Sequence, residues 1–225
     1  MLRLRLYFGK TPLMRYTAHL DTQRALERTI RRAKLPLAYS EGFTPHAKMN
    51  LAAALPLGFT SIGELADIWL VAKQNQFSDM LSEEIPVEDV LAAMQQSAPP
   101  GLVFYQGVVV HLKEASLQAR VISAEYCCCL HTPQAELPQR IAALLSSVSL
   151  PRERRGKSYN LRPLIESLCE GDVDEKNFCI GGKQHLWMRL KTREGASGRP
   201  DEVLDALGIP LHEAAIQRTR LIIAE

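Results

Sequence analysis

Apolar and basic residues alternate at the start of the chain, where Leu2, Leu4 and Leu6 are separated by Arg3 and Arg5. A period of two is typical of a β-strand, in which successive side chains point to opposite faces. The first residues therefore predict a strand with one apolar face and one basic face.

The spacing then changes to that of a helix, which we expect over residues 18–34. Leu26 and Ile30 lie four positions apart on its apolar side. Thr17 is suited to cap the first turn. Pro36 ends the helix, because proline has no backbone N–H to continue the hydrogen-bonding pattern.

The rest of the first half contains two further strand patterns and two further helix patterns. The strands are expected over residues 64–72 and 102–112, with an extended segment over residues 49–55 before them, and the helices over residues 75–84 and 87–96. This order of elements is that of a split βαβ, or ferredoxin-like, unit.

The second half follows the same order of elements, without a repeat in the sequence itself. Strands are expected over residues 120–131, 184–192 and 214–223, helices over residues 135–147 and 201–207, and a short helix or strand over residues 164–169. We therefore predict an α+β protein with two tandem ferredoxin-like (βαββαβ) modules, residues 1–115 and 116–225.

Charge is distributed unevenly along the chain. The whole sequence has a net charge of +2, whereas residues 1–48 contain ten basic and three acidic residues, a local net charge of +7. A local basic excess in a nearly neutral protein favours a surface for phosphate groups, although a solvated face is the usual meaning of such a run.

Four arginines are spaced along the predicted helix of residues 18–34. Guanidinium groups at such spacing can follow a phosphate backbone through charge-assisted bonds. Glu27 lies four residues before Arg31 and could neutralise part of this charge. The four arginines are Arg24, Arg28, Arg31 and Arg32.

The segment after the helix mixes aromatic, basic and turn-forming residues. Tyr39 and Phe43 could stack on bases, and His46 and Lys48 add polar contacts, a combination used in single-stranded RNA recognition. Alternatively, Phe43 belongs to the core and His46 bonds a backbone carbonyl. The predicted RNA-binding residues are Arg24, Arg28, Arg31, Arg32, Tyr39, Ser40, Phe43, His46 and Lys48.

A catalytic alternative uses the two histidines of this region. His19 and His46, with Tyr39 or Ser40, could form an acid–base site that cuts RNA without a metal. A structural role for these histidines is the competing interpretation, and no catalytic residue is assigned.

Cysteine spacing and hydropathy argue against several kinds of binding site and against a membrane span. The five cysteines form no Cys-x-x-Cys pair, so we expect no metal site and no cofactor, only small apolar residues in a reduced protein. Residues 181–183 do not complete a P-loop pattern. The chain has no run of about 18 apolar residues and no signal-peptide pattern at its start. We therefore expect a cytoplasmic protein without a membrane span.

Several short motifs resemble a bacterial family of radical-SAM-linked proteins of unknown function. They include Tyr16-Thr17-Ala18-His19-Leu20-Asp21, Tyr39-Ser40-Glu41-Gly42-Phe43-Thr44-Pro45-His46, Leu55-Pro56-Leu57-Gly58 and Arg199-Pro200. The resemblance is dense over residues 8–67 and sparse beyond them.

The resemblance implies an accessory protein that works with a radical-SAM enzyme on RNA or on a ribosome-linked substrate. The chain lacks the Cys-x-x-x-Cys-x-x-Cys motif, which fits a partner of such an enzyme. Two alternatives remain. One is a metal-independent endoribonuclease resembling CRISPR repeat-associated RNA-processing proteins, and the other is a purely structural docking subunit.

Overall fold

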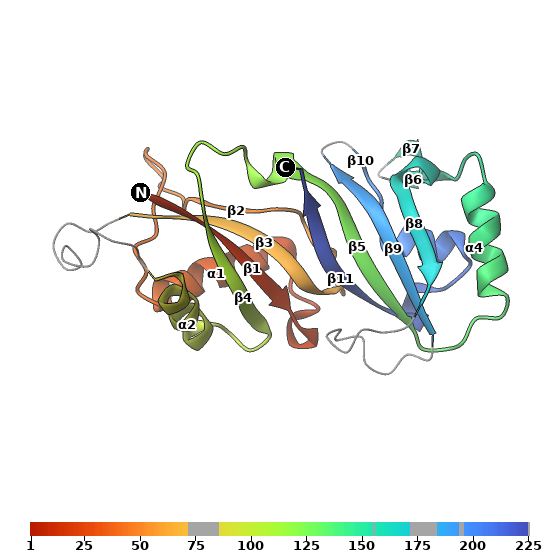
Figure 1. Cartoon of the computed structure of the whole chain (residues 1–225), viewed down its shortest axis with the longest axis horizontal. Coiled ribbons are helices and arrows are strands. Elements are labelled where there is room, and N and C mark those ends of the chain that lie inside the picture. Colours follow the sequence, from red (N-terminus) through yellow and green to blue (C-terminus); the bar gives the residue numbers. More distant parts are fainter. Residues whose placement is uncertain (72–85, 155, 172–183, 194–195, 225) are drawn as a thin grey trace. The chain divides into compact units, whose positions relative to one another are not determined.

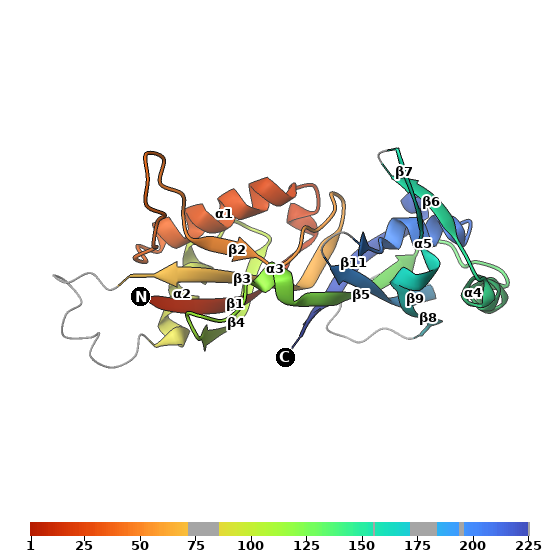
Figure 2. The ribbon, with the colours of Figure 1, turned by 90° about the horizontal axis from the view of Figure 1, so that it is seen from above.

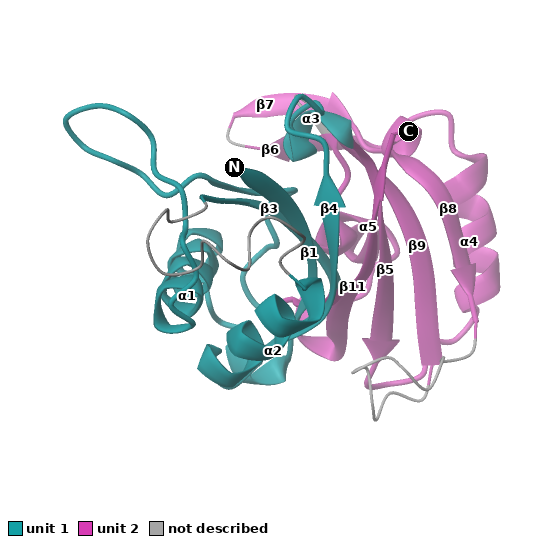
Figure 3. Cartoon of the chain, turned by 60° about the vertical axis from the view of Figure 1, so that its left-hand side comes forward, with its two compact units in different colours: residues 1–58, 63–120 teal, residues 59–62, 121–225 magenta. Residues whose placement is uncertain are grey.

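The computed structural model describes residues 1–71, 86–154, 156–171, 184–193 and 196–224. The chain has a mixed α+β fold, with a large, mostly antiparallel sheet and few helices (Figure 1). It divides into two compact units (Figure 3). Unit 1 comprises Met1–Gly58 and Gly63–Arg120, and unit 2 comprises Phe59–Ile62 and Val121–Glu225.

Unit 1 has the strand order β4-β1-β3-β2, and β4 and β2 run antiparallel to the strands beside them. The predicted helix over residues 75–84 lies outside the described residues. The elements of this unit are β1 (Leu2–Lys10), η1 (Pro12–Met14), α1 (His19–Arg32), β2 (Met49–Leu51), β3 (Thr60–Leu70), α2 (Val87–Ser97), β4 (Leu102–Val110) and α3 (Leu117–Arg120).

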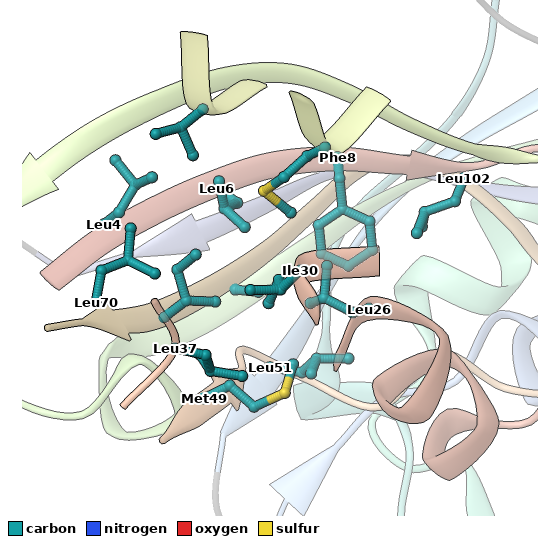
Figure 4. Close-up of a cluster of buried hydrophobic side chains, with 14 of the residues drawn as sticks. Leu4, Leu6, Phe8, Leu26, Ile30, Leu37, Met49, Leu51, Leu70 and Leu102 are labelled. Atoms are coloured by element: carbon teal, nitrogen blue, oxygen red, sulfur yellow. The ribbon is translucent and has the colours of Figure 1, made fainter. Parts of the chain in front are cut away.

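The core of unit 1 lies between its strands and its two longer helices (Figure 4). Leu4 and Leu6 of β1 meet Leu26 and Ile30 of α1 in this core, and all four side chains are fully buried. A fully buried side chain of this size contributes about 1.5–3 kcal/mol to folding. The alternation in β1 and the apolar side of α1 therefore form as predicted.

The opposite face of β1 is also buried, which corrects the expected role of its basic residues. Arg3 and Arg5 bond the carboxylate of Asp67 in β3 at 2.6 and 2.9 Å. Arg5 also pairs with Glu114 at 3.0 Å, and Glu114 pairs with Arg120. These five residues are named the buried arginine cluster. Asp67 and Glu114 together offset two of its three positive charges, and Arg3 and Arg5 themselves are buried, so these two arginines do not form an exposed basic face.

Unit 2 has the strand order β11-β5-β9, and β8 and β10 both pair with β9. These pairs are antiparallel, whereas the first residues of β3 pair in parallel with β11. The elements of this unit are β5 (Val121–Leu130), α4 (Leu137–Ser146), β6 (Pro151–Arg154), β7 (Lys157–Asn160), η2 (Arg162–Leu164), β8 (Ile165–Glu170), β9 (Gln184–Arg193), β10 (Ala196–Ser197), α5 (Pro200–Ala206), η3 (Leu211–Glu213) and β11 (Ala214–Ile223).

Candidate nucleic-acid interface

Helix α1 buries one side and exposes the other. Thr22 and Thr29 are tolerated on the buried side because each donates its hydroxyl to the carbonyl four residues earlier, at 3.0 and 2.8 Å. The predicted cap at Thr17 is wrong. The helix begins at His19, and Ala18 occupies the N-cap position without a side-chain bond.

The exposed side of α1 carries Arg24, Arg28, Arg31 and Arg32, which we name the arginine stripe. Arg24 bonds Asp21 at 3.1 Å, and the two side chains are 67% and 56% exposed. An ion pair this exposed contributes only about 0–1 kcal/mol. Among the described residues the other three arginines form no ion pair, not even with Glu27, so their charge is available to an anion.

The end of α1 redirects the chain towards the sheet. Lys34 has a left-handed backbone with φ of 58°. Its N–H bonds the carbonyl of Arg31 at 3.1 Å, and the N–H of Leu35 bonds the carbonyl of Ile30 at 3.2 Å. This is the Schellman arrangement that closes many helices. Pro36 follows, and the chain enters the edge of the sheet.

The edge strand of unit 1 is interrupted by a loop. Ahead of the loop, the N–H of Ala38 donates to the carbonyl of Trp69 in β3 at 2.7 Å. Beyond it, the N–H of Trp69 donates to the carbonyl of Lys48 at 3.1 Å, and β2 continues the pairing. Residues 39–47 therefore leave the sheet and return to the same neighbouring strand. We name them the 39–47 loop.

Two hydrogen bonds close the base of the 39–47 loop. The N–H of Ser40 donates to the carbonyl of His46 at 2.8 Å, and the N–H of His46 donates to the hydroxyl of Ser40 at 2.9 Å. Tyr39 and Ala47 form an isolated bridge beneath them. Figures 2 and 3 show this segment projecting from the body of unit 1. Ser40 therefore braces the loop.

The tip of the loop presents an aromatic ring to solvent. Phe43 has a relative exposure of 110%, so its predicted alternative as a core residue is wrong. Gly42 has φ of 129°, a conformation that side chains rarely adopt. Tyr39 is 41% exposed nearer the base. The aromatic residues of the candidate site are thus accessible, and the most exposed one is the farthest from the core.

The two histidines of the catalytic alternative belong to different ends of α1. His19 opens the helix, whereas the loop with His46 begins seven residues after the helix ends at Arg32. A helix of 14 residues is about 21 Å long. The loop base is anchored at Trp69, near the end of β3 that receives the chain from the C-terminal end of α1. His19 and the loop that contains His46 are therefore separated along the chain by the length of this helix.

The basic excess of residues 1–48 is smaller at the surface than the sequence indicated. Arg3, Arg5 and Lys10 are buried, with relative exposures of 2–4%. The ammonium group of Lys10 donates to the carbonyl of Thr17 at 2.8 Å. Seven basic residues then face three acidic ones, a local excess of four positive charges. The arginine stripe supplies four of those seven basic residues.

The β6–β7 hairpin also carries basic residues, and acidic residues of α5 pair with two of them. Arg154 bonds Glu202 at 2.7 Å and lies 5.1 Å from the centre of the Tyr159 ring. Arg152 pairs with Asp205 at 3.4 Å. Burial, together with the hydrogen bond to Glu202, raises the pKa of Tyr159 to about 12. These contacts make the segment a structural element of unit 2.

The cysteines differ in environment. Burial raises the pKa of Cys127 to about 11 and that of Cys128 well above its ordinary value. Cys169 is exposed and free. Cys129 is disulfide-bonded, so the expectation of reduced cysteines is wrong there. Within the described ranges no cluster of three or more potential ligands could hold a metal, and no described helix is long and apolar enough to cross a bilayer.

A comparison with models of protein families identifies the family of this chain. The model of a family described as "Uncharacterized protein conserved in bacteria (DUF2344)" matches residues 3–200. The chain belongs to this family. No curated protein matched the chain.

The comparison with solved structures found two chains with distant structural similarity and very low sequence identity. A chain of the "Cbf5-Nop10-Gar1 Complex" has 10% identity and a TM-score of 0.48, and the similarity covers 99% of this chain and 50% of that one. A chain of the "archaeal box H/ACA sRNP Nop10-Cbf5 complex" has 11% identity and a TM-score of 0.43, with coverage of 99% and 49%. The chain spans about half the length of these structures, and similarity at this level carries no argument about function.

The sequence did not indicate how the candidate residues are supported. Ala38, Trp69 and Lys48 anchor the loop through their backbones, which no side-chain motif reveals. The apolar residues on either side of the loop, Leu37 and Met49, are 7% and 6% exposed. In the sequence, apolar residues on both sides of a polar stretch were the signal that one strand continues across an insertion.

Proposed function

We propose that this chain is a non-catalytic accessory protein that binds RNA, or a ribosome-linked substrate, and works with a radical-SAM enzyme. The observation that carries the proposal is the arginine stripe, three of whose members have no acidic partner in the described part of the chain. Exposed guanidinium groups bind phosphate oxygens through charge-assisted, often bidentate bonds.

The dimensions of the stripe suit a nucleic-acid backbone. Arg24 and Arg32 are eight residues apart, which corresponds to about 12 Å along a helix. Such a length can hold a few consecutive phosphates of one strand. The 39–47 loop follows the same helix and adds exposed aromatic rings, as RNA-binding surfaces commonly do.

We also infer that the two units are ferredoxin-like modules. The strand order β4-β1-β3-β2 in unit 1 corresponds position by position to β11-β5-β9-β8 in unit 2. In chain order, a helix follows the first and the third of these four strands in each unit. The β6–β7 hairpin would then be an insertion in the second module. This inference concerns the fold and carries no function.

The radical-SAM partner is proposed from the resemblance of the short motifs. Its test is co-expression of this chain with a radical-SAM enzyme encoded beside its gene, followed by affinity purification of one and detection of the other. Recovery of both proteins in constant proportion supports the partnership, and recovery of the tagged protein alone contradicts it.

The RNA proposal is tested by measuring affinity for a pool of cellular RNA across a series of salt concentrations. Each phosphate contact changes the slope of log K against log salt by about −0.7 to −0.9. The double variant Arg28→Ala, Arg32→Ala should therefore weaken binding and flatten the slope by about 1.4–1.8. The matched control is Lys113→Ala, Arg220→Ala, which removes the same charge from other exposed positions.

Two results would decide against RNA binding at this surface. Equal effects of the two double variants would show a general effect of charge. The absence of binding by the unaltered protein at low salt would favour a structural docking subunit, for which the fully exposed Phe43 offers a contact. Tight co-purification of a partner protein without RNA would then support that second function.

A further inference from the structure

The candidate surface separates charge from aromatic contact. The tip of the 39–47 loop, residues 41–44, contains no lysine or arginine and carries the acidic Glu41. The arginine stripe lies on α1. The tip is therefore poorly suited to hold a phosphate, and the two parts of the surface must contact different parts of a ligand.

The loop is built to hold its tip in place. Its two ends are hydrogen-bonded to the same residue of β3, Trp69, and its base is closed by the reciprocal bonds between Ser40 and His46. Pro45 restricts the backbone just beyond the tip. A group presented on a braced support loses little conformational entropy when it binds, which favours affinity.

The exposure of the Phe43 side chain to water is unfavourable in free energy. Its ring has a relative exposure of 110% and lies outside the core of unit 1. The free energy of an aromatic side chain falls when its faces leave water. The ring is therefore stabilised when another molecule covers it. The loop follows α1 in the chain, so a molecule that covers the ring and also reaches the arginine stripe should be anionic and have flat apolar faces.

A nucleobase in RNA meets both requirements, provided that it is unpaired. Bases inside an A-form helix are stacked on their neighbours, and the deep, narrow major groove keeps side chains away from them. Bases in bulges, loops and ends can be splayed out and stacked on an aromatic side chain. Phosphates that flank such a base remain free to contact arginines.

We propose that Phe43 stacks on an unpaired base of a structured RNA while the arginine stripe holds phosphates beside it. This inference rests on the proposed RNA-binding function and names the class of RNA: a paired region interrupted by a bulge or closed by a loop. A fully paired duplex contacts only the stripe and binds less tightly.

The test compares two RNAs of equal length, a perfect duplex and the same duplex with one unpaired 2-aminopurine. Stacking of a base on an aromatic residue corresponds to roughly 5- to 150-fold in affinity. The unaltered protein should prefer the bulged RNA within that range and quench 2-aminopurine fluorescence. Phe43→Ala should remove the preference and the quenching while leaving duplex affinity unchanged. Phe43→Trp should retain both.

The double variant Arg28→Ala, Arg32→Ala is the complementary measurement. It should weaken binding of both RNAs by the same factor and leave their ratio unchanged. Because the Phe43 side chain is fully exposed, its replacement should not alter folding, which circular dichroism checks.

The possible failures are distinguishable. Equal affinity for the two RNAs, with no effect of Phe43→Ala, would overturn the stacking inference and leave the proposed function standing. No binding of either RNA at low salt would overturn both. An unchanged RNA preference in Phe43→Ala, together with loss of a co-purifying protein, would assign the tip to protein docking instead.

Discussion

Asp67 allows a quantitative test of how unit 1 is held together. Its carboxylate is 0% exposed and accepts two hydrogen bonds each from Arg3 and Arg5, at 2.6–3.1 Å. Asp67→Asn keeps the shape of the side chain and removes its charge. Two guanidinium groups, 2% and 5% exposed, then lose their shared anion.

Breaking a buried ion pair by removing one partner costs about 3–5 kcal/mol, because the remaining charge stays buried and uncompensated. Arg5 would keep Glu114 at 3.0 Å, and Arg3 would keep the backbone carbonyls of Glu114 and Ala115. We therefore expect the lower end of the range, about 3 kcal/mol. For a chain of this length that corresponds to a fall of roughly 6–12 °C in Tm.

The assay is urea unfolding followed by tryptophan fluorescence. The chain has two tryptophans, Trp69 and Trp187. Arg3 lies 5.0 Å from the centre of the Trp69 ring, so this residue reports on the cluster itself. In a Trp187→Phe background the signal comes from unit 1 alone.

Two control variants isolate the effect of burial. Asp21→Asn makes the same chemical change at the exposed pair with Arg24 and should cost less than about 1 kcal/mol. Replacing Arg3, Arg5 and Asp67 together by Met, Leu and Leu should recover most of the lost stability, because no unpaired charge remains buried. A loss for Asp67→Asn no larger than that for Asp21→Asn would refute the reasoning.

Three further predictions concern other parts of the chain. Lys34→Gly should stabilise the protein by about 0.5–1 kcal/mol in thermal unfolding, because glycine adopts a φ of 58° without strain; a lower Tm would contradict this. In the native protein at pH 8, a thiol reagent should label Cys169 rapidly and Cys127 slowly, since Cys127 is buried with a pKa of about 11; peptide mass spectrometry measures both rates, and equal rates would count against the burial. The pKa of Tyr159 is raised from 10.0 to about 12, so its contribution to stability should be complete below pH 10 and lost as the pH rises towards 12. The stability difference between the unaltered protein and Tyr159→Phe should therefore shrink over that interval in urea unfolding, and a constant difference would be inconsistent with the raised pKa.

Local patterns predicted most of the elements that the structure contains. The strand over residues 214–223 has the predicted bounds, and the helix expected over residues 87–96 is α2, Val87–Ser97. Period-two and helical spacings of apolar residues reflect which side of a segment is buried. The type of element can therefore be predicted from the sequence. The predicted stop at Pro36 is close to the true end, but the left-handed Lys34 closes the helix and Pro36 only follows it.

Long-range electrostatics could not be predicted in the same way. Arg3 and Arg5 read as a basic face because Asp67 and Glu114, which neutralise them, are more than 60 residues away in sequence. Charge counting along the chain therefore overstated the basic surface of residues 1–48. The stripe on α1 was recognisable because helical spacing alone decides which residues share a side.

The candidate loop was recognised by its composition, but its geometry was not. Gly42 and Pro45 indicated a turn, whereas the exposure of Phe43 depends on where residues 38 and 48 are anchored. That anchoring uses backbone groups of Trp69, which any residue could supply. Sequence reasoning therefore proposed the residues of a candidate site and left their arrangement open.

The interruption of the edge strand also bears on the solubility of the protein. A long, regular edge strand exposes a row of unpaired N–H and C=O groups that can pair with another molecule. Here the edge beside β3 is divided into residues 36–38 and 48–51, with the 39–47 loop between them. Deleting the loop would join these pieces into one continuous edge and favour edge-to-edge aggregation. We therefore expect the nine residues that present Phe43 also to hinder self-association through this edge of the sheet.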